Sequence, residues 1–302
     1  MMNSSAAPAW AVAIFASRES LATLSECVAA LVEACRFSQK AAVIDVLVNG
    51  NPELGHAASG VLASCPNVEV RVRSIQLGDK ANAWNEYVHT FWPGAQTTFF
   101  VDGYVRVQAD AFGLLDGAIA SDPSFLGATG VPSVGRTAGA LRSQMIAGGG
   151  MHGNMHALSN KAISAYRDNH VKLPVGLYRT DSLIGAIMMF RFDPAQFKWD
   201  ASVVKVQPDA TWGLIDQPRF GPALIKSYWK RKLRQSQGQL ENLAVHEHMA
   251  IRRLTPQSLP GTARQLVLDW VERHPSKVRK LAVKNFLVLH AMYKLRNQPG
   301  AR

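Results

Sequence analysis

The sequence predicts an α/β fold in which a mostly parallel, Rossmann-like central sheet is flanked by helices and followed by a basic helical C-terminal extension. Short apolar runs alternate with helix-like segments through the first half of the chain, as in βαβ units. These runs end in Gly, Asn, Asp or Pro, which is typical of loops at strand ends. Lys and Arg are concentrated in the last third of the chain.

The first half supplies the predicted strands and helices in order. A helix follows the first strand, because Ser20 can cap it. The third strand alternates apolar and charged residues and is therefore half-buried. In chain order we expect strand Trp10–Ala16, a helix to about Cys35, strand Ala41–Val48, strand Val68–Ile75, helix Lys80–His89 and the buried strand Thr97–Val101.

Three polar segments follow predicted strands: Ser17-Arg18, Asn49-Gly50-Asn51 and Asp102-Gly103-Tyr104. Open α/β sheets bind ligands beyond the carboxyl ends of their strands, so these segments are the candidate site loops. From about Phe125 the pattern is less regular, and the Gly148–Gly150 stretch is equally compatible with a flap over a site and with a linker.

We expect a main domain over residues 1–218 and a basic, mainly helical extension over residues 219–302. The first part holds 16 Lys and Arg against 18 Asp and Glu, whereas the second holds 17 against 4. Residues Pro275–Arg296 are expected to form an amphipathic helix with Val278, Leu281, Leu289 and Met292 on one face. That helix either packs on its own domain or contacts an anionic membrane surface.

Composition limits the class of protein further. The chain has 302 residues, 47% of them hydrophobic and 18% charged, as expected for a folded globular protein. No apolar run reaches the length of about 20 residues that a membrane-spanning helix needs. Cys27, Cys35 and Cys65 lack metal-site spacing, so we expect reduced thiols and a cytoplasmic protein, with peripheral contact at the inner face of the membrane left open.

Three ordered blocks resemble family 2 glycosyltransferases of GT-A fold, over roughly residues Val12 to Gly238. The blocks are Gly78-Asp79-Lys80-Ala81-Asn82-Ala83-Trp84-Asn85, Phe99-Phe100-Val101-Asp102-Gly103-Tyr104-Val105 and Thr180-Asp181-Ser182-Leu183-Ile184-Gly185. Each block alone is a weak signal, and their shared order is more specific. The resemblance implies a GT-A fold and a nucleoside diphosphate sugar as the donor.

The resemblance assigns several residues to the donor. Lys80 and Asn85 match the block that opens a helix beside the nucleotide, and a helix N-terminus and a lysine both favour phosphate. Asp102 matches the aspartate that approaches the ribose, with Gly103 and Tyr104 beside it. Ser17, Arg18 and Asn49 are expected near the nucleotide base.

A divalent cation, Mg²⁺ or Mn²⁺, is the cofactor that the resemblance implies. Tyr104 stands where the family has its second, metal-binding acid, and a phenol is a poor ligand for a hard cation. Asp102 would remain as a ligand, and His246, in His246-Glu247-His248, is an alternative late in the chain. Arg231 and Arg234, in the segment Tyr228–Arg234, either replace the cation at the diphosphate or lie on a solvated helix.

The resemblance also places the catalytic base. Asp181 matches the aspartate that takes the proton of the acceptor hydroxyl, although it can also cap the helix expected over Ser182–Met189. Thr180 replaces the neighbouring acid of the family. We expect acceptor contacts from Thr180 and from the loop that holds His152, Asn154 and His156, where the glycines argue against a helical pair of metal ligands.

The function that these residues predict is inverting transfer of a sugar from a nucleoside diphosphate sugar to a hydroxyl of a glycan or a lipid-linked acceptor. A catalytically lapsed relative that only binds remains an alternative, because Tyr104 replaces an acid. A sugar nucleotidyltransferase is less compatible, since Ala16–Glu19 is not a Gly-rich, basic phosphate loop. No nucleic-acid partner is expected, because basic and aromatic residues form no recognised binding motif.

Overall fold

The structure is a computed structural model that describes residues 7–133, 138–215 and 222–297, with the side chains of residues 222–227 left out. It confirms the predicted α/β fold, with a curled, mostly parallel sheet between helices. The described strands are β1 Trp10–Ala16, β2 Ala42–Asn49, β3 Val68–Ile75, β4 Thr97–Asp102, β5 Val105–Val107, β6 Gly127–Pro132, β7 Met155–Ser159 and β8 Val204–Leu214.

The helices of the main domain lie between these strands in the sequence. They are α1 Leu21–Phe37, α2 Pro52–Val61, α3 Lys80–Glu86 with its π-helical continuation η1 Tyr87–Phe91, α4 Ala111–Ala120, α5 Ala138–Gly148, α6 Asn160–Asp168 and α7 Thr180–Met189. The sheet order is β3-β2-β1-β4-β7-β6-β8-β5. The four strands from β3 to β4 are parallel, and β7 is antiparallel to both of its neighbours.

Alternating side chains of β1 lie on opposite faces of the sheet, and each face is buried in a hydrophobic core. Trp10, Val12 and Ile14 belong to a core shared with α1, α2 and α4. Ala13 and Phe15 belong to a second core, which is shared with α3, η1, α6 and α7. Because both faces are covered, the central strands are apolar throughout. Ligand access is therefore confined to the strand ends.

Most of the predicted N-terminal elements are confirmed within one or two residues. The Ser20 hydroxyl accepts a hydrogen bond from the Thr23 backbone amide at 3.1 Å, which caps α1 as predicted. Asp79 caps α3 in the same way, accepting from the Asn82 amide at 2.8 Å. One capping prediction is wrong: Asp181 lies inside the first turn of α7, and Arg179 occupies the N-cap position.

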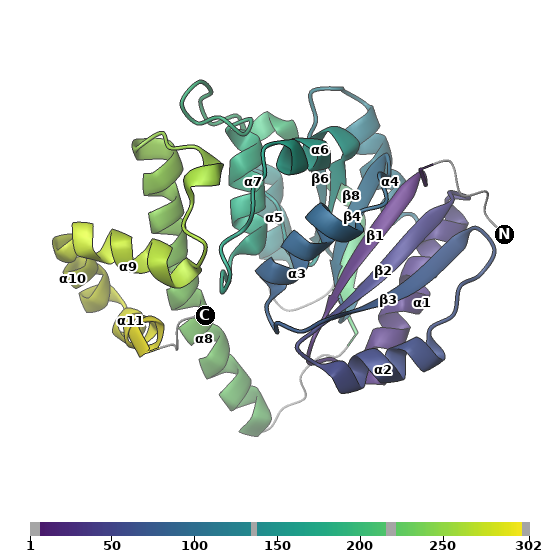
Figure 1. Cartoon of the computed structure of the whole chain (residues 1–302), viewed down its shortest axis with the longest axis horizontal. Coiled ribbons are helices and arrows are strands. Elements are labelled where there is room, and N and C mark those ends of the chain that lie inside the picture. The colour runs from purple at the N-terminus through teal and green to yellow at the C-terminus, as the bar shows by residue number, and fades with distance from the viewer. Residues whose placement is uncertain (1–6, 134–137, 216–221, 298–302) are drawn as a thin grey trace.

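The C-terminal region is helical and lies beside the sheet domain, at the left of Figure 1. It consists of α8 Pro222–His246, the π-helical turn η3 Glu247–Ile251, the short 3₁₀ turn Pro256–Ser258, α9 Ala263–Arg273, α10 Pro275–Lys284 and α11 Leu287–Asn297. Its helices enclose an apolar cluster of their own, which includes Leu240, Val267, Trp270 and Val288. The predicted boundary between residues 218 and 219 lies outside the described residues.

The prediction of a single helix over Pro275–Arg296 is wrong, because the helix is interrupted at Asn285. Asn285 has an extended backbone, its amide donates to the Ser236 hydroxyl at 3.1 Å, and its Oδ1 accepts from the Leu287 amide at 3.2 Å. An asparagine that bonds nearby backbone competes with the helix and ends it. The break leaves Val278 and Met292 buried, as predicted, whereas Leu289 is exposed.

Two backbone segments meet where β2 ends and α3 begins. Gly50 has a φ of +66°, and a methyl group added to it would overlap the Cα atom of Gly78. Only glycine combines that conformation with so close an approach. In the described part of the chain, no helix is long and apolar enough to cross a membrane.

Candidate functional site

The three predicted site loops converge at the carboxyl ends of β1, β2 and β4. The Asn49 amide, which is buried, donates to the Ala16 carbonyl at 2.9 Å, and the Asn51 amide donates to the Ser17 carbonyl at 2.8 Å. The backbone amides of Ser17 and Arg18 donate to the Glu19 carboxylate. Asn49 thus joins the first two strand ends by its side chain, and the Arg18 side chain is exposed beside them.

Asp102, at the end of β4, accepts hydrogen bonds from two side chains. Its Oδ1 accepts a short hydrogen bond from the Lys80 ammonium group, which comes from the first turn of α3. Its Oδ2 accepts from the Tyr104 hydroxyl at 2.8 Å. Burial, followed by the charge and the hydrogen bond of Asp102, raises the pKa of Tyr104, so the phenol keeps its proton. Next to them, the Gly103 amide donates to the Phe15 carbonyl at 2.9 Å.

Asp181 approaches this cluster from α7, on the other side of the loop at residues 151–154. A Cβ atom added to Gly153 would lie 3.3 Å from Asp181 Cγ, so the carboxylate packs against the Gly153 backbone. The carbonyl of the same Gly153 accepts from Lys80 Nζ at 3.4 Å. Gly153 therefore lies between Asp181 and the Lys80–Asp102 pair. Within the described part of the chain, the Asp181 carboxylate has no hydrogen-bond or ion-pair partner.

The charged groups of this cluster act on the pKa of His152. Burial is the main cause that lowers its pKa; the carboxylates of Asp181 and Asp102 oppose that effect, and Lys80 and Arg179 add to it. Its Nδ1 accepts from the Asn154 amide at 3.2 Å, which assigns the proton of the neutral ring to Nε2. His152 is therefore a neutral imidazole that donates through Nε2.

Asn154 and His156 hold the loop in place. The Asn154 carbonyl accepts from the Asp102 amide at 3.3 Å, and its side-chain oxygen lies 3.4 Å from the Tyr104 hydroxyl. His156 is only 2% exposed, stacks on Phe100 and donates from Nδ1 to the His152 carbonyl at 3.0 Å. Its ring therefore supports the loop from beneath and offers no surface to an acceptor. Thr180 is likewise buried.

Asn85 faces away from the Asp102 cluster. Its amide donates to the Leu173 carbonyl at 2.9 Å and its oxygen accepts from the Leu173 amide at 2.8 Å. Both ends of the side chain are thus used to fix the strand-like segment after α6, next to a separate cavity of about 440 Å³. In this structure Asn85 is a positioning residue for that segment.

Three residues that the sequence did not point to complete the cluster. The buried Glu241, on α8, accepts from the backbone amides of Tyr178 and Arg179 at 3.0 to 3.1 Å. The guanidinium groups of Arg179 and Arg234 lie 5.9 and 5.7 Å from the Tyr178 ring centre. Tyr178 also acts electrostatically on Tyr104. The only sequence signal was the position of Arg179, two residues before Asp181.

Of the two predicted arginines, the structure brings one towards this cluster. Arg234 reaches the Tyr178 ring, as described, and Arg179 contributes a second cation there. Arg231 is exposed on α8, and no contact of its side chain is found among the described residues. Nε of Arg179 is buried and, within the described ranges, has no hydrogen-bond partner.

The residues at the site do not fit a divalent cation. Both oxygens of Asp102 accept hydrogen bonds from Lys80 and Tyr104, and Tyr104 is a protonated phenol. Nowhere in the described part of the chain do three or more His, Cys, Asp or Glu side chains gather as a metal site. The side chains of the His246-Glu247-His248 segment point to different surroundings and form no common metal site. His246 lies on the surface, Glu247 pairs with Arg273 and His274, and His248 is hydrogen-bonded to the 255–258 turn.

Comparisons with known proteins support the fold. No protein-family model and no curated protein matches the sequence. The structure is similar to the mannosyltransferase PcManGT from Pyrobaculum calidifontis, solved with GDP-Man and Mn²⁺, with a TM-score of 0.55 and 13% identity, over 97% of this chain and 86% of that one. It is also similar to S. aureus TarS 1–349, solved with UDP-GlcNAc, with a TM-score of 0.51 and 12% identity, over 95% and 80% of the two chains. The chain therefore has a fold of the GT-A type.

Proposed function

We propose that this protein is an inverting glycosyltransferase that moves a sugar from a nucleoside diphosphate sugar to a hydroxyl group of a glycan or a lipid-linked acceptor. The observation that carries the proposal is the placement of Asp102 and Asp181 on the two sides of Gly153. The fold supports it, because PcManGT and TarS share that fold and were solved with sugar nucleotides.

Asp181 is the proposed general base. It takes the proton of the acceptor hydroxyl as that oxygen attacks the anomeric carbon, while the bond from this carbon to the diphosphate breaks on the opposite face. One carboxylate suffices for such a single displacement. The carboxylate of Asp181 is suited to the role because no described side chain already donates to it.

The departing diphosphate is stabilised, in this proposal, by protein cations. Lys80 is hydrogen-bonded to Asp102, and Arg179 and Arg234 lie beside the ring of Tyr178. Fixed positive charges at a developing negative charge supply a large part of catalysis. The proposed enzyme thus uses no Mg²⁺ or Mn²⁺, unlike the Mn²⁺-containing PcManGT complex. Ser17, Arg18 and Asn49 are assigned to the base side of the donor, and His152 and Asn154 to the acceptor side.

The test is a thermal-shift panel of nucleoside diphosphate sugars in the presence of EDTA. A ligand at about 100 times its Kd stabilises the native state by about 2.7 kcal/mol, so a true donor raises the melting temperature. Asp102→Asn and Lys80→Met should reduce the shift. Asp181→Asn should keep the shift and lose transfer, because the base is not needed for donor binding.

Asp168→Asn, at the exposed end of α6, is the matched control and should behave as the wild type. A donor shift that vanishes in EDTA and returns with Mn²⁺ would refute the metal-free site. A donor shift without transfer or hydrolysis would support the lapsed relative instead. If no sugar nucleotide changes the melting temperature at millimolar concentration, the proposal fails.

We also propose that the protein associates with an anionic membrane surface through α10 and α11. Val283, Leu289 and Tyr293 are exposed on these helices, and Phe286 is exposed in the turn between them. The exposed basic side chains beside them in the sequence are Lys277, Arg279, Lys280, Lys284, Lys294 and Arg296. Exposed apolar side chains among lysines and arginines are typical of helices that lie on anionic lipid.

A further inference from the structure

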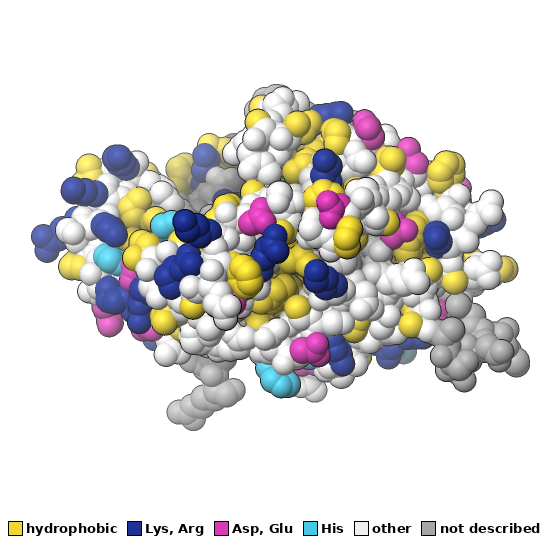
Figure 2. Space-filling view, turned by 90° about the horizontal axis from the view of Figure 1, so that it is seen from above, with side chains coloured by type: hydrophobic (Ala, Val, Ile, Leu, Met, Phe, Trp, Pro, Cys, Tyr) yellow, Lys and Arg dark blue, Asp and Glu magenta, His cyan; other side chains and the backbone are white. Residues whose placement is uncertain are grey.

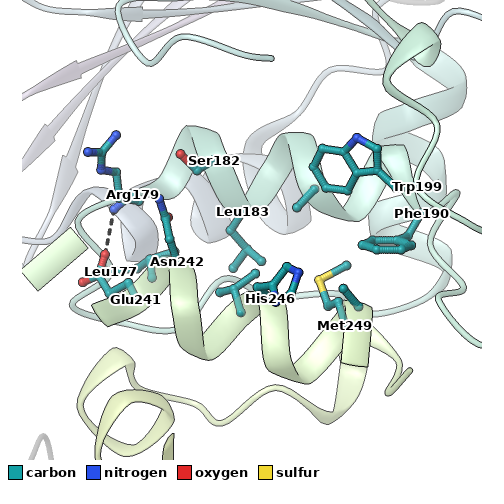
Figure 3. A pocket seen from close by; sticks show the side chains of 13 residues that line it. Leu177, Arg179, Ser182, Leu183, Phe190, Trp199, Glu241, Asn242, His246 and Met249 are labelled. Carbon is teal, nitrogen blue, oxygen red and sulfur yellow. Dashed lines mark hydrogen bonds between the residues drawn. The ribbon is translucent and has the colours of Figure 1, made fainter. Parts of the chain in front are cut away.

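A second cavity lies between α7 and the α8–η3 segment, and Arg179 and Glu241, described above with the Asp102 cluster, form part of its wall. It has a volume of about 210 Å³. Figure 3 shows Arg179 and Ser182 at one end and Phe190 and Trp199 at the other. Its lining residues are mainly apolar; those used below are Ser182, Ala186, Phe190, Trp199, Met249 and Ala250.

The lining favours a hydrocarbon ligand. The one carboxylate in it, Glu241, is already bonded to the amides of Tyr178 and Arg179. Most of the remaining lining residues are aliphatic, aromatic or thioether groups, which gain free energy by excluding water. The polar residues among them are Arg179, Ser182, Asn242 and His246. A dry protein cavity of about 150 Å³ accepts benzene, so this larger one has room for a ring or a segment of alkyl chain.

The helix α7 connects this cavity to Asp181. Asp181 and Gly185, one turn apart, face the 151–153 loop, because a Cβ atom added to Gly185 would lie 3.4 Å from Met151 Cβ. Ser182, Ala186 and Phe190, also spaced by four residues, line the cavity on the neighbouring stripe of the helix. Asp181 and the cavity thus lie on two stripes of one helix, about 100° apart around its axis. A flexible molecule with a hydroxyl at Asp181 can bend around α7 into the cavity.

The Trp199 end of the cavity opens among aromatic and basic side chains. Trp199 is 55% exposed and stacks edge-on against Phe190, and Phe197 is 41% exposed. Lys198 is exposed next to Trp199 in the sequence. The Arg253 guanidinium donates to the Ala195 carbonyl at 3.5 Å, which joins the 193–199 segment to the 251–253 segment, where Arg252 is also exposed. An amphipathic tryptophan among cations suits the boundary between hydrocarbon and anionic headgroups.

We propose that this cavity, the α7–α8 pocket, binds an alkyl chain of a lipid acceptor whose hydroxyl lies at Asp181. The inference rests on the proposed function and narrows its acceptor from glycan or lipid to lipid. In this proposal the pocket holds the part of the alkyl chain nearest the reacting hydroxyl, and Trp199 lies where the alkyl chain leaves the pocket.

The probe is an alkyl glycoside whose chain ends in bromine, used below its critical micelle concentration, with methyl glycoside as the chain-free control. Bromine quenches a tryptophan that it touches, so the wild type should show saturable quenching. Trp199→Phe should lose most of that quenching. Trp229→Phe, which removes a tryptophan of similar exposure (50%) on α8, should retain it.

Two variants fill the pocket from opposite walls, Ala186→Leu from α7 and Ala250→Leu from η3. Each should weaken the apparent affinity for the alkyl glycoside by about tenfold or more, because the chain loses its apolar contacts. Melting temperatures establish that each variant is folded. Since Ala250 is only half-buried, it remains informative if Ala186→Leu does not fold.

The experiments can refute the lipid-binding pocket and the transferase function independently of each other. Quenching that is unsaturable, or that survives in both filled variants, overturns the pocket even when sugar nucleotides still raise the melting temperature. Saturable quenching that the filled variants lose supports the pocket, even when no sugar nucleotide binds and the transferase itself is refuted. If the wild type has a lower KM for the alkyl glycoside than for the methyl glycoside, and the filled variants do not, both the pocket and the transferase function are supported.

Discussion

At the scale of single residues, His156 shows how a buried imidazole supports the site. Burial, helped by the charge of Lys80 and opposed by the hydrogen bond to the His152 carbonyl, lowers its pKa to about 3, so the ring is neutral at physiological pH. In the unfolded chain the same ring titrates near its usual value of 6.5. Between these two values the unfolded chain binds the extra proton, so stability falls as the pH drops below 6.5.

His156→Gln should therefore flatten the acid side of the stability profile. At pH 5 the neutral native ring costs about 2 kcal/mol of unfolding free energy relative to pH 7.5, since each pKa unit corresponds to about 1.4 kcal/mol. The measurement is the unfolding free energy in urea at both pH values for wild type, His156→Gln and the exposed control His56→Gln. Equal pH dependence of the wild type and His156→Gln would contradict a neutral His156.

The sequence supplied candidate site residues but not the contacts between them. Asp102, Asp181 and Lys80 were recognised from short motifs, but the Lys80–Asp102 ion pair depends on how α3 packs against β4. Asn85 belongs to the same motif as Lys80, and its partner, Leu173, is 88 residues away in the chain. Contacts of that range leave no local signal, which is also why Arg179 and Glu241 were missed.

At the scale of elements, Glu241 connects α8 to the start of α7. Its carboxylate accepts the amides of Tyr178 and Arg179 and the Gln237 side chain at 2.8 Å. Burial raises its pKa, while these hydrogen bonds act in the opposite direction. The start of α7, with Asp181 on it, is thus held by a residue of the C-terminal helices.

Glu241→Ala should destabilise the protein and impair catalysis together. Two backbone amides would lose their acceptor, and each unsatisfied buried group costs about 1–3 kcal/mol. Thermal unfolding and transfer kinetics measure the two effects, with the exposed Glu272→Ala on α9 as the control. A stable variant with unchanged kcat would show that α8 does not position Asp181.

Strands and capped helices were predictable because their signals are local. The Ser20 cap placed α1, and the helix predicted over Lys80–His89 corresponds to α3 and its π-helical continuation. The break at Asn285 depends on Ser236, another long-range contact, so the sequence suggested one helix where there are two. The strand β7 was missed because it follows the glycine-rich stretch and pairs antiparallel between distant strands.

At the scale of the whole molecule, the C-terminal helices carry the excess of basic side chains, whereas the sheet domain has nearly balanced charge. Figure 2 shows Lys and Arg side chains gathered over the side where the C-terminal helices lie. The sequence predicted this asymmetry because composition needs no contacts. It did not predict which apolar residues remain exposed: Phe286 and Tyr293 are exposed beside the basic side chains, and so is Leu289, which was expected on the apolar face.

Sedimentation with vesicles tests the proposed membrane surface. The protein should bind vesicles that contain phosphatidylserine more than neutral phosphatidylcholine vesicles, and salt should weaken that binding. The double variant Phe286→Ser and Leu289→Ser should bind less. Phe37→Ser, which changes an exposed phenylalanine at the end of α1, should bind as the wild type does. Equal binding to neutral vesicles would contradict the proposal.

The contact of Gly50 with Gly78 has a consequence for how the site can change over time. Gly78 precedes Lys80 by two residues, so a bulkier residue at position 50 would push the start of α3, and with it the ammonium group, away from Asp102. The distance between Lys80 and Asp102 therefore depends on position 50, where the glycine has no side chain. Variants with altered donor preference should arise elsewhere and leave this glycine untouched.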